Sequence, residues 1–391
     1  MLLHLLNDEK FTESHIDIFE NVNPDNNLFL IGYLEDRGSF KHVDSLKEKV
    51  VTAKYFSDEY FEKIGELGGY EAVIINGLSG PKENLIRKSS QDVNFVWNSW
   101  GYDYVKLLRK NLYSEKTKDL VTKLNADFED VDWKRWVKKS PLIKIYRKLQ
   151  FWRRRIIKKK TFKKISYFST VLPQEADILK EKLHLSAKYV PFNYGHTALL
   201  IRQNESHSLS RDKNNILCGN SANPTNNHID IFDKLGKIEL GNRKIITPLS
   251  YPGRKEYVAR ITKLGKQKLG ENFQPLYEFI PFQEYFELLT SCAVGIFNHN
   301  RQQGGGNINL LLWLGAKVFI SEKNLYYDFY NQKSAAVFSF ENDWTNSEKD
   351  LEPLKPDLQK KNRKIVEGYF GYEAILERAK NYVETITGDS V

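Results

Sequence analysis

The clearest signal in this chain is Asn298-His299-Asn300-Arg301-Gln302-Gln303-Gly304-Gly305-Gly306-Asn307, a polar and glycine-rich stretch. The apolar run before it, 293–297, predicts a strand, and the apolar residues after it, 308–313, have helical spacing. Glycines in such a strand–turn–helix unit let the backbone approach a phosphate, and the first N–H groups of the helix point toward the anion. Arg301 adds a cation that can donate two hydrogen bonds. The alternative is an ordinary polar turn, although three glycines beside Arg-Gln-Gln exceed what a turn requires.

The composition is that of a folded protein long enough for two domains, with 391 residues, 41% hydrophobic and 28% charged. Its two cysteines, Cys218 and Cys292, lie in separate apolar segments and have the spacing of neither a metal site nor a disulfide framework. A reducing compartment fits them best. The amino-terminal residues 1–8 lack the features of a signal peptide and predict a first strand. Since no apolar run reaches about 18 residues, we expect a protein that is cytosolic or lies on a membrane surface.

The positive charge is concentrated in one segment. Residues 133–164 contain 15 Lys or Arg and no Asp or Glu, whereas the whole chain carries only +9. Tryptophans and aliphatic residues alternate with these cations at roughly helical spacing, which is typical of an amphipathic helix on an anionic membrane surface. Two alternatives stay open. One is a basic helix that packs on the protein by its aromatic face, and the other is a nucleic-acid patch, which no recognised nucleic-acid motif accompanies.

Strand-like runs alternate with helical segments along the whole chain. The first series of predicted strands is 2–6, 28–33, 72–76, 94–97, 165–169 and 189–192, and the second is 216–219, 244–248, 277–280, 294–297, 318–320 and 336–338. Such alternation favours parallel sheets of the doubly wound α/β kind. The polar stretch 203–212 divides the two series. We therefore expect domains at 1–202 and 213–354, with a carboxy-terminal helix, 355–391, crossing back onto the first domain.

The second predicted domain has further polar residues where its strands end. Gly219, Asn220 and Ser221 follow a strand, and their N–H and hydroxyl groups could hold a phosphate or a ribose. His228 near a helix start could add a proton-bearing partner, and Tyr251 after the next strand could stack on a base. Helix capping is the alternative for Asn220 and Ser221, packing for His228, and a rigid turn for Tyr251.

Several motifs in their order resemble those of the bacterial TDP-N-acetylfucosamine:lipid II N-acetylfucosaminyltransferases, glycosyltransferase family 56, also called 4-alpha-L-fucosyltransferases. The resemblance runs from residue 1 to about 320 and is strongest from 214 to 316. The motifs are His4 in the first strand, Trp97-Asn98-Ser99-Trp100-Gly101-Tyr102-Asp103, Gly219-Asn220-Ser221, Asn226-Asn227-His228-Ile229, Tyr251-Pro252 and Arg301-Gln302-Gln303-Gly304-Gly305-Gly306.

This resemblance implies a GT-B architecture, two Rossmann-like domains with a cleft between them. It implies an acceptor on the amino-terminal domain and a sugar nucleotide on the carboxy-terminal one. The acceptor would be a saccharide linked to a polyprenyl diphosphate at the cytoplasmic face of the inner membrane, which agrees with the basic aromatic segment 133–164 as a peripheral anchor. The expected donor-binding residues are Gly219, Asn220, Ser221, His228, Tyr251, Arg301, Gln302, Gln303, Gly304, Gly306 and Asn307.

No metal or cofactor is expected besides the sugar nucleotide, which is a substrate. The sequence has no Asp-x-Asp between residues 69 and 103 or near the glycine-rich stretch, so it does not indicate a metal-dependent clamp on the diphosphate. Arg301 and the helix N–H groups would offset the charge of the leaving diphosphate instead.

An acceptor hydroxyl that attacks a sugar needs a base, and two residues are candidates. Asp103 follows a strand end and a Trp-Gly turn, where the chain should face a ligand site; its alternative is helix capping. His4 lies in the first strand, and its alternative is a packed histidine in the core.

We therefore expect a transferase that moves a 6-deoxy-sugar, N-acetylfucosamine or fucose, from a nucleotide diphosphate to a lipid-linked saccharide. The nucleotide would be dTDP, with GDP and UDP as alternatives. A transferase for another sugar of a capsule, O-antigen or protein glycan is the second hypothesis. A basic nucleic-acid-binding protein is the third, and it would leave the Arg-Gln-Gln-Gly stretch unexplained.

Overall fold

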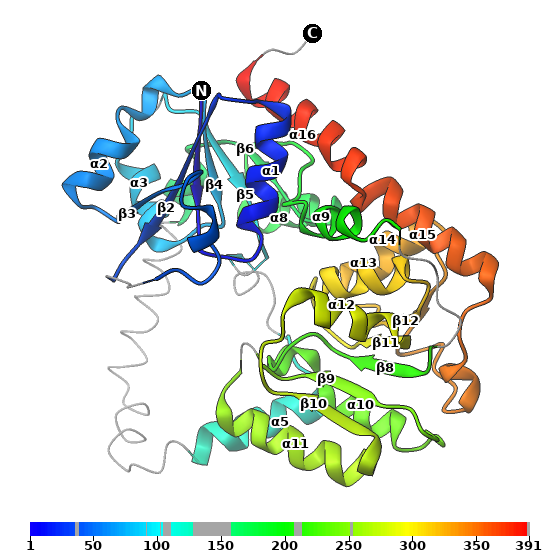
Figure 1. Ribbon diagram of the computed structural model, residues 1–391. Coiled ribbons are helices and arrows are strands. Elements are labelled where there is room, and N and C mark those ends of the chain that lie inside the picture. Colours follow the sequence, from blue (N-terminus) through cyan, green and yellow to red (C-terminus); the bar gives the residue numbers. More distant parts are fainter. Residues whose placement is uncertain are drawn as a thin grey trace. The chain divides into compact units, whose positions relative to one another are not determined.

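The computed structural model describes residues 1–35, 39–90, 92–101, 103–104, 111–127, 158–206, 213–250 and 253–388. These residues form two compact units, shown in Figure 1. The first unit draws on the ranges 1–108, 144–203 and 370–391, and the second on 109–143 and 204–369. Each unit contains one sheet, and every strand pair in both sheets is parallel.

The sheet of the first unit has seven strands in the order β3-β2-β1-β4-β5-β6-β7. The strand order reverses between β1 and β4, where the crossovers on either side lead away in opposite directions. The central strands β1 and β4 are mostly apolar and buried along their whole length, as expected for a parallel sheet covered on both faces. The strands are β1 (Leu2–Leu6), β2 (Asn27–Tyr33), β3 (Val51–Lys54), β4 (Ala72–Asn76), β5 (Phe95–Asn98), β6 (Ile165–Ser169) and β7 (Lys188–Tyr189).

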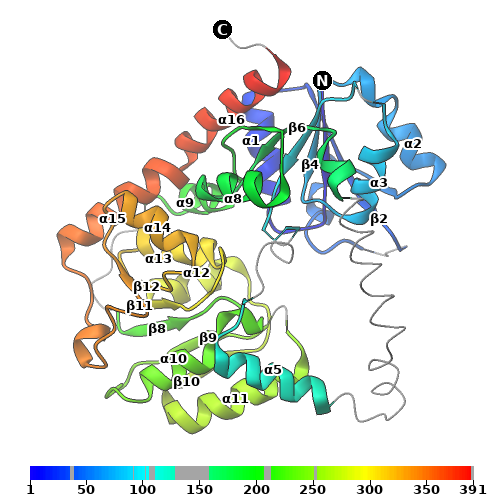
Figure 2. The ribbon, with the colours of Figure 1, turned by 180° about the vertical axis from the view of Figure 1, so that it is seen from behind.

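Helices cover both faces of this sheet. Figures 1 and 2 show α1 and α16 on one side of the strands and α2 and α3 on the other. The face under α1 and α16 has a core in which Phe19, Phe192 and Tyr382 pack with the side chains of β1, β2 and β4. The helices are α1 (Thr12–Val22), α2 (Asp58–Ile64), α3 (Gly80–Lys88), α8 (Gln174–Leu183), α9 (His196–Gln203) and α16 (Tyr372–Thr387).

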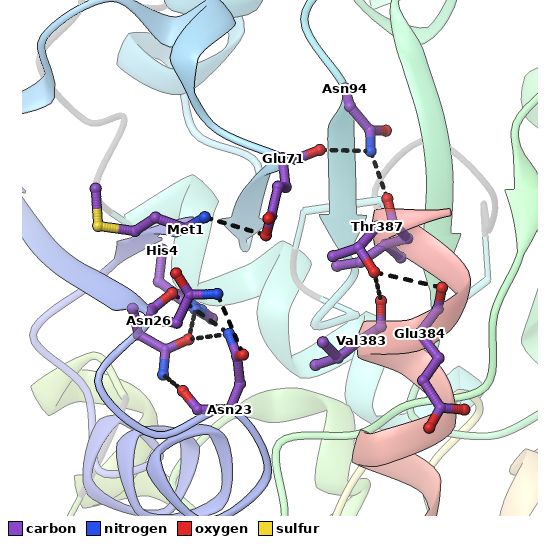
Figure 3. Close-up of polar contacts among 11 residues, drawn as sticks. Met1, His4, Asn23, Asn26, Glu71, Asn94, Val383, Glu384 and Thr387 are labelled. Atoms are coloured by element: carbon purple, nitrogen blue, oxygen red, sulfur yellow. Dashed lines mark hydrogen bonds and ion pairs between the residues drawn. The ribbon is translucent and has the colours of Figure 1, made fainter. Parts of the chain in front are cut away.

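Polar contacts fasten α16 to the first unit at both ends. At its start, the Tyr372 hydroxyl donates to Asp17 at 2.6 Å. At its end, Asn94 Nδ2 donates to the carbonyls of Glu71 at 3.0 Å and Ile386 at 2.6 Å, the bridge drawn in Figure 3. Apolar burial of the helix and these bonds together make α16 an integral layer of the unit.

The sheet of the second unit has six strands in the order β10-β9-β8-β11-β12-β13. This is the order of a dinucleotide-binding fold, and the strand order reverses between β8 and β11. The strands are β8 (Asn215–Cys218), β9 (Ile245–Pro248), β10 (Phe273–Leu276), β11 (Cys292–Phe297), β12 (Lys317–Ile320) and β13 (Val337–Ser339).

Two layers of helices enclose this second sheet. One layer, α5, α10 and α11, contributes Leu120, Phe232 and Ile261 to a core shared with β8, β9 and β11. The other layer contains α12, α13 and α14, seen on the opposite side of the strands in both ribbon views. The helices are α5 (Glu115–Asp127), α10 (His228–Leu235), α11 (Lys255–Leu269), α12 (Phe282–Thr290), α13 (Gly305–Trp313), α14 (Leu325–Gln332) and α15 (Pro356–Phe370).

The structure differs from the expected division of the chain at two places. Helix α5, expected in the first domain, belongs to the second unit, where Leu120 joins the core and the Ser114 hydroxyl donates to Asp230 at 2.5 Å. The expected single helix 355–391 is two helices: α15 belongs to the second unit, and only α16 belongs to the first.

One predicted strand is wrong and one was missed. The run 277–280 follows β10 and is not a strand; Tyr277 and Phe279 are 45% and 65% exposed. The true strand contains Pro275, which an edge strand accepts because one side of it forms no ladder. Strand β3 is also an edge, and its short polar sequence, VTAK, lacks an apolar pattern. Within the described residues, no helix is long and apolar enough to cross a membrane.

Candidate functional site

The glycine-rich loop of the second unit lies at the reversal point of its sheet. Residues 298–304 connect β11 to α13, and Gly219 and Asn220 follow the neighbouring strand β8. In open α/β sheets this crevice, outside the carboxyl ends of the strands, is where ligands bind. The structure therefore brings two of the predicted motifs together, although 78 residues separate Thr225 from Gln303, which are hydrogen-bonded.

A buried histidine holds this loop against the end of β8. His299 Nε2 lies 2.8 Å from Asn226 Oδ1 and 3.1 Å from Asn220 Oδ1, so this nitrogen carries the proton and donates. Burial, then Arg301 and His228, keep the pKa of His299 well below its usual value. The ring is therefore a neutral positioning group.

Amide side chains complete the support of the loop. Gln303 Nε2 donates to Asn220 at 3.0 Å, and the Thr225 hydroxyl donates to Gln303 Oε1 at 2.6 Å. Asn227 Nδ2 donates to the carbonyl of Asn298 at 2.7 Å. Charge-neutral bonds of this kind fix a backbone without adding an anion that would repel a phosphate.

At two positions in this region only glycine fits, because a larger side chain would collide with a neighbour. Gly219 has a φ of +71°, and a side chain there would meet Asn226 Oδ1 at 2.5 Å. A side chain on Gly305, the first residue of α13, would meet the Tyr326 hydroxyl at 1.9 Å. Gly306 differs from both, since a Cβ there would have nothing within 4 Å. The space next to Gly306 is therefore open.

The start of α13 has the properties of an anion site. Its first intrahelical bond runs from Ile308 N–H to the carbonyl of Gly304, so the N–H groups of Gly305, Gly306 and Asn307 precede the helical ladder. They carry the positive end of the helix dipole. Arg301, in the loop that leads into α13, is half-buried, and its Nη1 donates to the carbonyl of Gln302 at 3.2 Å.

The other predicted donor residues take different places. Gln302 is buried, the Ser221 hydroxyl accepts from Asn226 at 3.1 Å, and Asn307 donates to the Tyr285 hydroxyl at 2.8 Å. The structure does not support the predicted donor contact of His228. Its side chain is fully buried in the core, and its Nδ1 lies 3.1 Å from the Tyr257 hydroxyl. Tyr251 lies outside the described residues.

In the first unit, His4 is also a core residue and not a catalytic one. Its side chain is fully buried between the rings of Phe19 and Phe29. Its Nε2 donates to Asn27 Oδ1 at 3.1 Å, and its Nδ1 therefore accepts from His15 Nε2 at 2.9 Å. Figure 3 shows His4 beside the turn of Asn23 and Asn26. Burial lowers the pKa of His4 to about 3.

The carboxylate of Asp103 is occupied by the scaffold. One oxygen accepts from Leu78 N–H at 3.0 Å and Trp97 Nε1 at 2.9 Å, and the other accepts from Trp100 N–H at 3.2 Å. Burial raises its pKa, and these bonds act in the opposite direction. These three bonds give Asp103 a structural role and leave it poorly suited to act as a base, but they do not cap a helix.

The sequence reasoning missed a pair of charged residues at the reversal point of the first sheet. Glu9 follows β1 and is half-buried; burial raises its pKa to about 7. Lys82 is fully buried in α3, where burial lowers its pKa to about 7. Asn7 connects them, since its Nδ2 donates to Glu9 at 3.2 Å and its Oδ1 accepts from Lys82 at 2.8 Å. The sequence could have indicated this pair, because Glu9 follows the predicted strand 2–6 and Lys82 follows the predicted strand 72–76.

Most of the basic segment 133–164 lies outside the described residues. Its described end, 158–164, is attached to the first unit. Lys158 forms an ion pair with Glu83 at 3.1 Å, and the buried Phe162 stacks on Trp97 with ring centroids 5.4 Å apart. This end therefore packs by its aromatic face, one of the alternatives left open above.

The chain was compared with protein families. The model of the family described as 4-alpha-L-fucosyltransferase, glycosyl transferase group 56, matches residues 141–367. This range includes the glycine-rich loop and the whole sheet of the second unit. The part of the chain that matches the family therefore contains the anion site.

Several solved structures are similar over the whole chain. Sucrose-phosphate synthase from Thermosynechococcus elongatus has a TM-score of 0.64 at 12% identity, covering 100% of this chain and 99% of that one. HepE from Anabaena, in complex with UDP, has a TM-score of 0.60 at 9% identity, covering 98% and 100%. A putative UDP-N-acetylglucosamine 2-epimerase from Listeria monocytogenes has a TM-score of 0.55 at 10% identity, covering 100% and 97%.

These likenesses show the GT-B fold predicted from the sequence motifs. They do not decide the reaction, because the same architecture occurs in synthases and in an epimerase. The family match is the observation that distinguishes transfer from isomerisation.

The two neighbouring glycines of the loop should respond differently to alanine. Gly305→Ala places a methyl group against the Tyr326 hydroxyl and should lower the melting temperature by several degrees, because about 1–3 kcal/mol of overpacking is introduced. Gly306→Ala enters open space inside a helix and should leave the melting temperature equal or higher. Thermal unfolding of the two variants checks this. Equal melting temperatures would contradict the described contact.

Buried neutral histidines should make the protein sensitive to mild acid. Burial lowers the pKa values of His4, His196 and His228 from 6.5 to about 3. Between these values the unfolded chain binds protons that the folded chain excludes, so stability is lost as the pH falls below 6.5. Each such histidine removes about 1.4 kcal/mol per pH unit there. Glu9 has the opposite effect on stability, because its pKa is raised to about 7 in the folded protein, which therefore binds one proton more readily than the unfolded chain does.

We expect the melting temperature to fall steadily between pH 7 and pH 5 at constant ionic strength. His228→Asn should reduce this slope, because Asn keeps an acceptor for Tyr257 and has no proton to gain. His184→Asn is the matched control, since His184 is exposed. A melting temperature that is constant across this range would show that these histidines are not held neutral.

Proposed function

This chain belongs to the 4-alpha-L-fucosyltransferase family, glycosyl transferase group 56, and we propose that it transfers a 6-deoxy-sugar from a nucleoside diphosphate to a lipid-linked saccharide. It is a glycosyltransferase with the GT-B fold. The sugar would be of the N-acetylfucosamine or fucose type and the nucleotide dTDP. The product would enter a bacterial surface glycan.

The observation that carries the donor half of this proposal is the anion site at the start of α13. The N–H groups of Gly305, Gly306 and Asn307 would bind the diphosphate, and Arg301 would stabilise the charge that develops as the sugar leaves. The neutral network of His299, Asn220 and Gln303 would hold the loop in place without competing for the anion.

UDP is the second candidate nucleotide, because HepE, which shares the fold, was solved with UDP. Thermal-shift measurements with dTDP, UDP, GDP and CDP distinguish these donors. A nucleotide at about 100 times its dissociation constant adds about 2.7 kcal/mol to the stability of the state that binds it. A shift with none of the four would remove the basis of the proposal.

Glu9 is our candidate for the base that the transfer needs. The acceptor oxygen would bond to C1 of the donor sugar as the bond from C1 to the diphosphate oxygen breaks, and the hydroxyl proton would pass to the Glu9 carboxylate. Glu9 is half-buried at the reversal point of the first sheet. Lys82, Lys10 and Asp103 are the charged groups that act on it. A carboxyl poised near neutral pH is suited to this work.

The lipid-linked acceptor and a position on the cytoplasmic face of the membrane remain proposals supported by the basic segment 133–164. Its cations would bind anionic lipid headgroups, and its tryptophans outside 158–164 would enter the interface. Sedimentation with vesicles containing anionic lipid, at low and high salt, tests this. Binding to RNA or DNA in place of vesicles would favour the nucleic-acid alternative.

Arg301→Ala should weaken binding of the donor nucleotide by about 2 kcal/mol, or roughly thirtyfold in Kd, because a charge-assisted hydrogen bond is lost. Isothermal titration with the nucleoside diphosphate measures this. Arg260→Ala is the control, since Arg260 is exposed on α11 of the same unit. An unchanged Kd for Arg301→Ala would remove it from the phosphate site.

Glu9→Gln should lower kcat by about a hundredfold or more, the usual contribution of a general base, and leave the Kd of the donor unchanged. In the unaltered enzyme the rate should rise as the pH increases through about 7, since the carboxylate is the active form. This limb should be absent from the residual activity of the variant. Full activity in Glu9→Gln, or a pH dependence that persists in this variant, would show that another group accepts the proton.

A further inference from the structure

A fully buried cation, Lys82 of α3, lies against the ends of two central strands of the first sheet. Its Nζ donates to the carbonyls of Asn76 at 2.6 Å and Gly77 at 3.3 Å, where β4 ends, and to Asn7 Oδ1 at 2.8 Å, just after β1. An ammonium group has three protons to donate, and these three acceptors use all of them. The position of this charge is therefore fixed.

Lys82 also determines which way the amide of Asn7 points. An ammonium group can only donate, so the amide atom that faces it must be the oxygen. The amide nitrogen then donates to Glu9 Oε1 at 3.2 Å and to the carbonyl of Asn76 at 3.3 Å. A flipped amide would place its N–H groups against the ammonium and its oxygen against the carboxylate. The bond from Asn7 to Glu9 therefore depends on Lys82.

The charges of Glu9 and Lys82 depend on each other. Burial raises the pKa of Glu9 to about 7, while the charge of Lys82 and the bond from Asn7 act in the opposite direction. Burial lowers the pKa of Lys82 to about 7, while the charge of Glu9 opposes this change. Two groups that interact in this way titrate as a pair. Removing either charge therefore favours the neutral form of the other.

Three further titratable groups act on this pair. Asp103 opposes the charge of Glu9 and favours that of Lys82, and Lys10 favours the charge of Glu9. His15 stays neutral, since burial, His4 and then Lys82 keep its pKa well below its usual value. Among all these charged groups, Lys82 has the largest effect on Glu9.

We propose that Lys82 is a positioning residue for the transfer reaction: acting through the amide of Asn7, it holds Glu9 as the carboxylate that accepts the proton of the acceptor hydroxyl. Lys82 keeps its own three protons, because Asn7, Asn76 and Gly77 accept them, and it exchanges none during the reaction. This inference rests on the proposed function, since it explains how the base of that reaction is kept ionised.

Lys82→Met removes the charge and keeps a long side chain. The rise of kcat with pH should then occur about one pH unit higher, because the loss of a nearby opposite charge raises the pKa of a carboxyl. Above that pH, kcat should recover, whereas a purely structural defect would lower kcat equally at every pH. Lys88→Met is the matched control, since Lys88 is exposed at the end of the same helix. A rise of kcat at the unaltered pH in Lys82→Met would overturn the proposal.

Asn7→Asp tests the same path with little change in shape and does not require Lys82→Met to fold. It keeps the oxygen that faces Lys82 and replaces the nitrogen that donates to Glu9 by a second oxygen. Because two neighbouring carboxyl groups oppose each other's ionisation, the rise of kcat should again move to higher pH. An unmoved pH profile would contradict the role of the amide.

A direct titration needs neither substrates nor turnover. NMR of the Glu9 carboxyl carbon, assigned by comparison with Glu9→Gln, should give a higher titration midpoint in Lys82→Met than in the unaltered protein. Equal midpoints in the two proteins would refute the coupling of Lys82 to Glu9. Full transfer activity in Glu9→Gln would instead remove the base from the proposed function, so the two failures are distinguishable.

Discussion

Both units depend on the same constraint: polar side chains at the reversal point of a parallel sheet must be paired before the strands around them can be buried. The order of strands leaves the ends of β1 and β4 adjacent in one unit and those of β8 and β11 adjacent in the other. No crossover helix covers these ends, so the loops there carry the polar residues. An unpaired buried group would cost about as much as the gain from one well-buried side chain. Histidines and amides meet this demand while remaining uncharged.

The first unit shows how far such pairing extends. Asn27, His4 and His15 are hydrogen-bonded in sequence. Asn76 pairs with Asn98 and through it with Tyr382 in a second group, and its Nδ2 only contacts the protonated Nε2 of His15 at 3.4 Å. These residues come from two helices and four strands. Burial, then His4 and Lys82, keep the pKa of His15 well below its usual value, so both facing rings stay neutral and share one proton between their nitrogens.

The sequence predicted the main features of the fold because central parallel strands are apolar runs between polar ends. It also located the glycine-rich loop, since Gly304–Gly306 and Arg301 have a local chemical meaning. It misassigned His4 and His228, because the sequence around a histidine in an apolar segment is the same whether the side chain contacts a ligand or packs in the core. Asp103 was placed at the correct edge of the sheet, but the sequence does not show that Trp97, Trp100 and the more remote Leu78 all donate to its carboxylate. Glu9 and Lys82 acquire their shifted pKa values from burial, which composition does not reveal.

The position of α16 has a consequence for how the protein is made. The first unit buries Ile375, Ala379 and Tyr382 of that helix against β1, β2 and β4. Residues 372–387 are synthesised after every residue of the second unit. When the whole first sheet has been translated, the apolar side chains that α16 will cover are therefore still exposed beside α1. They stay exposed while the intervening residues are translated, when chaperones can bind them and aggregation can begin. The unit synthesised first is therefore the one completed last, and its hydrogen-bonded chain to Tyr382 closes only at that final step.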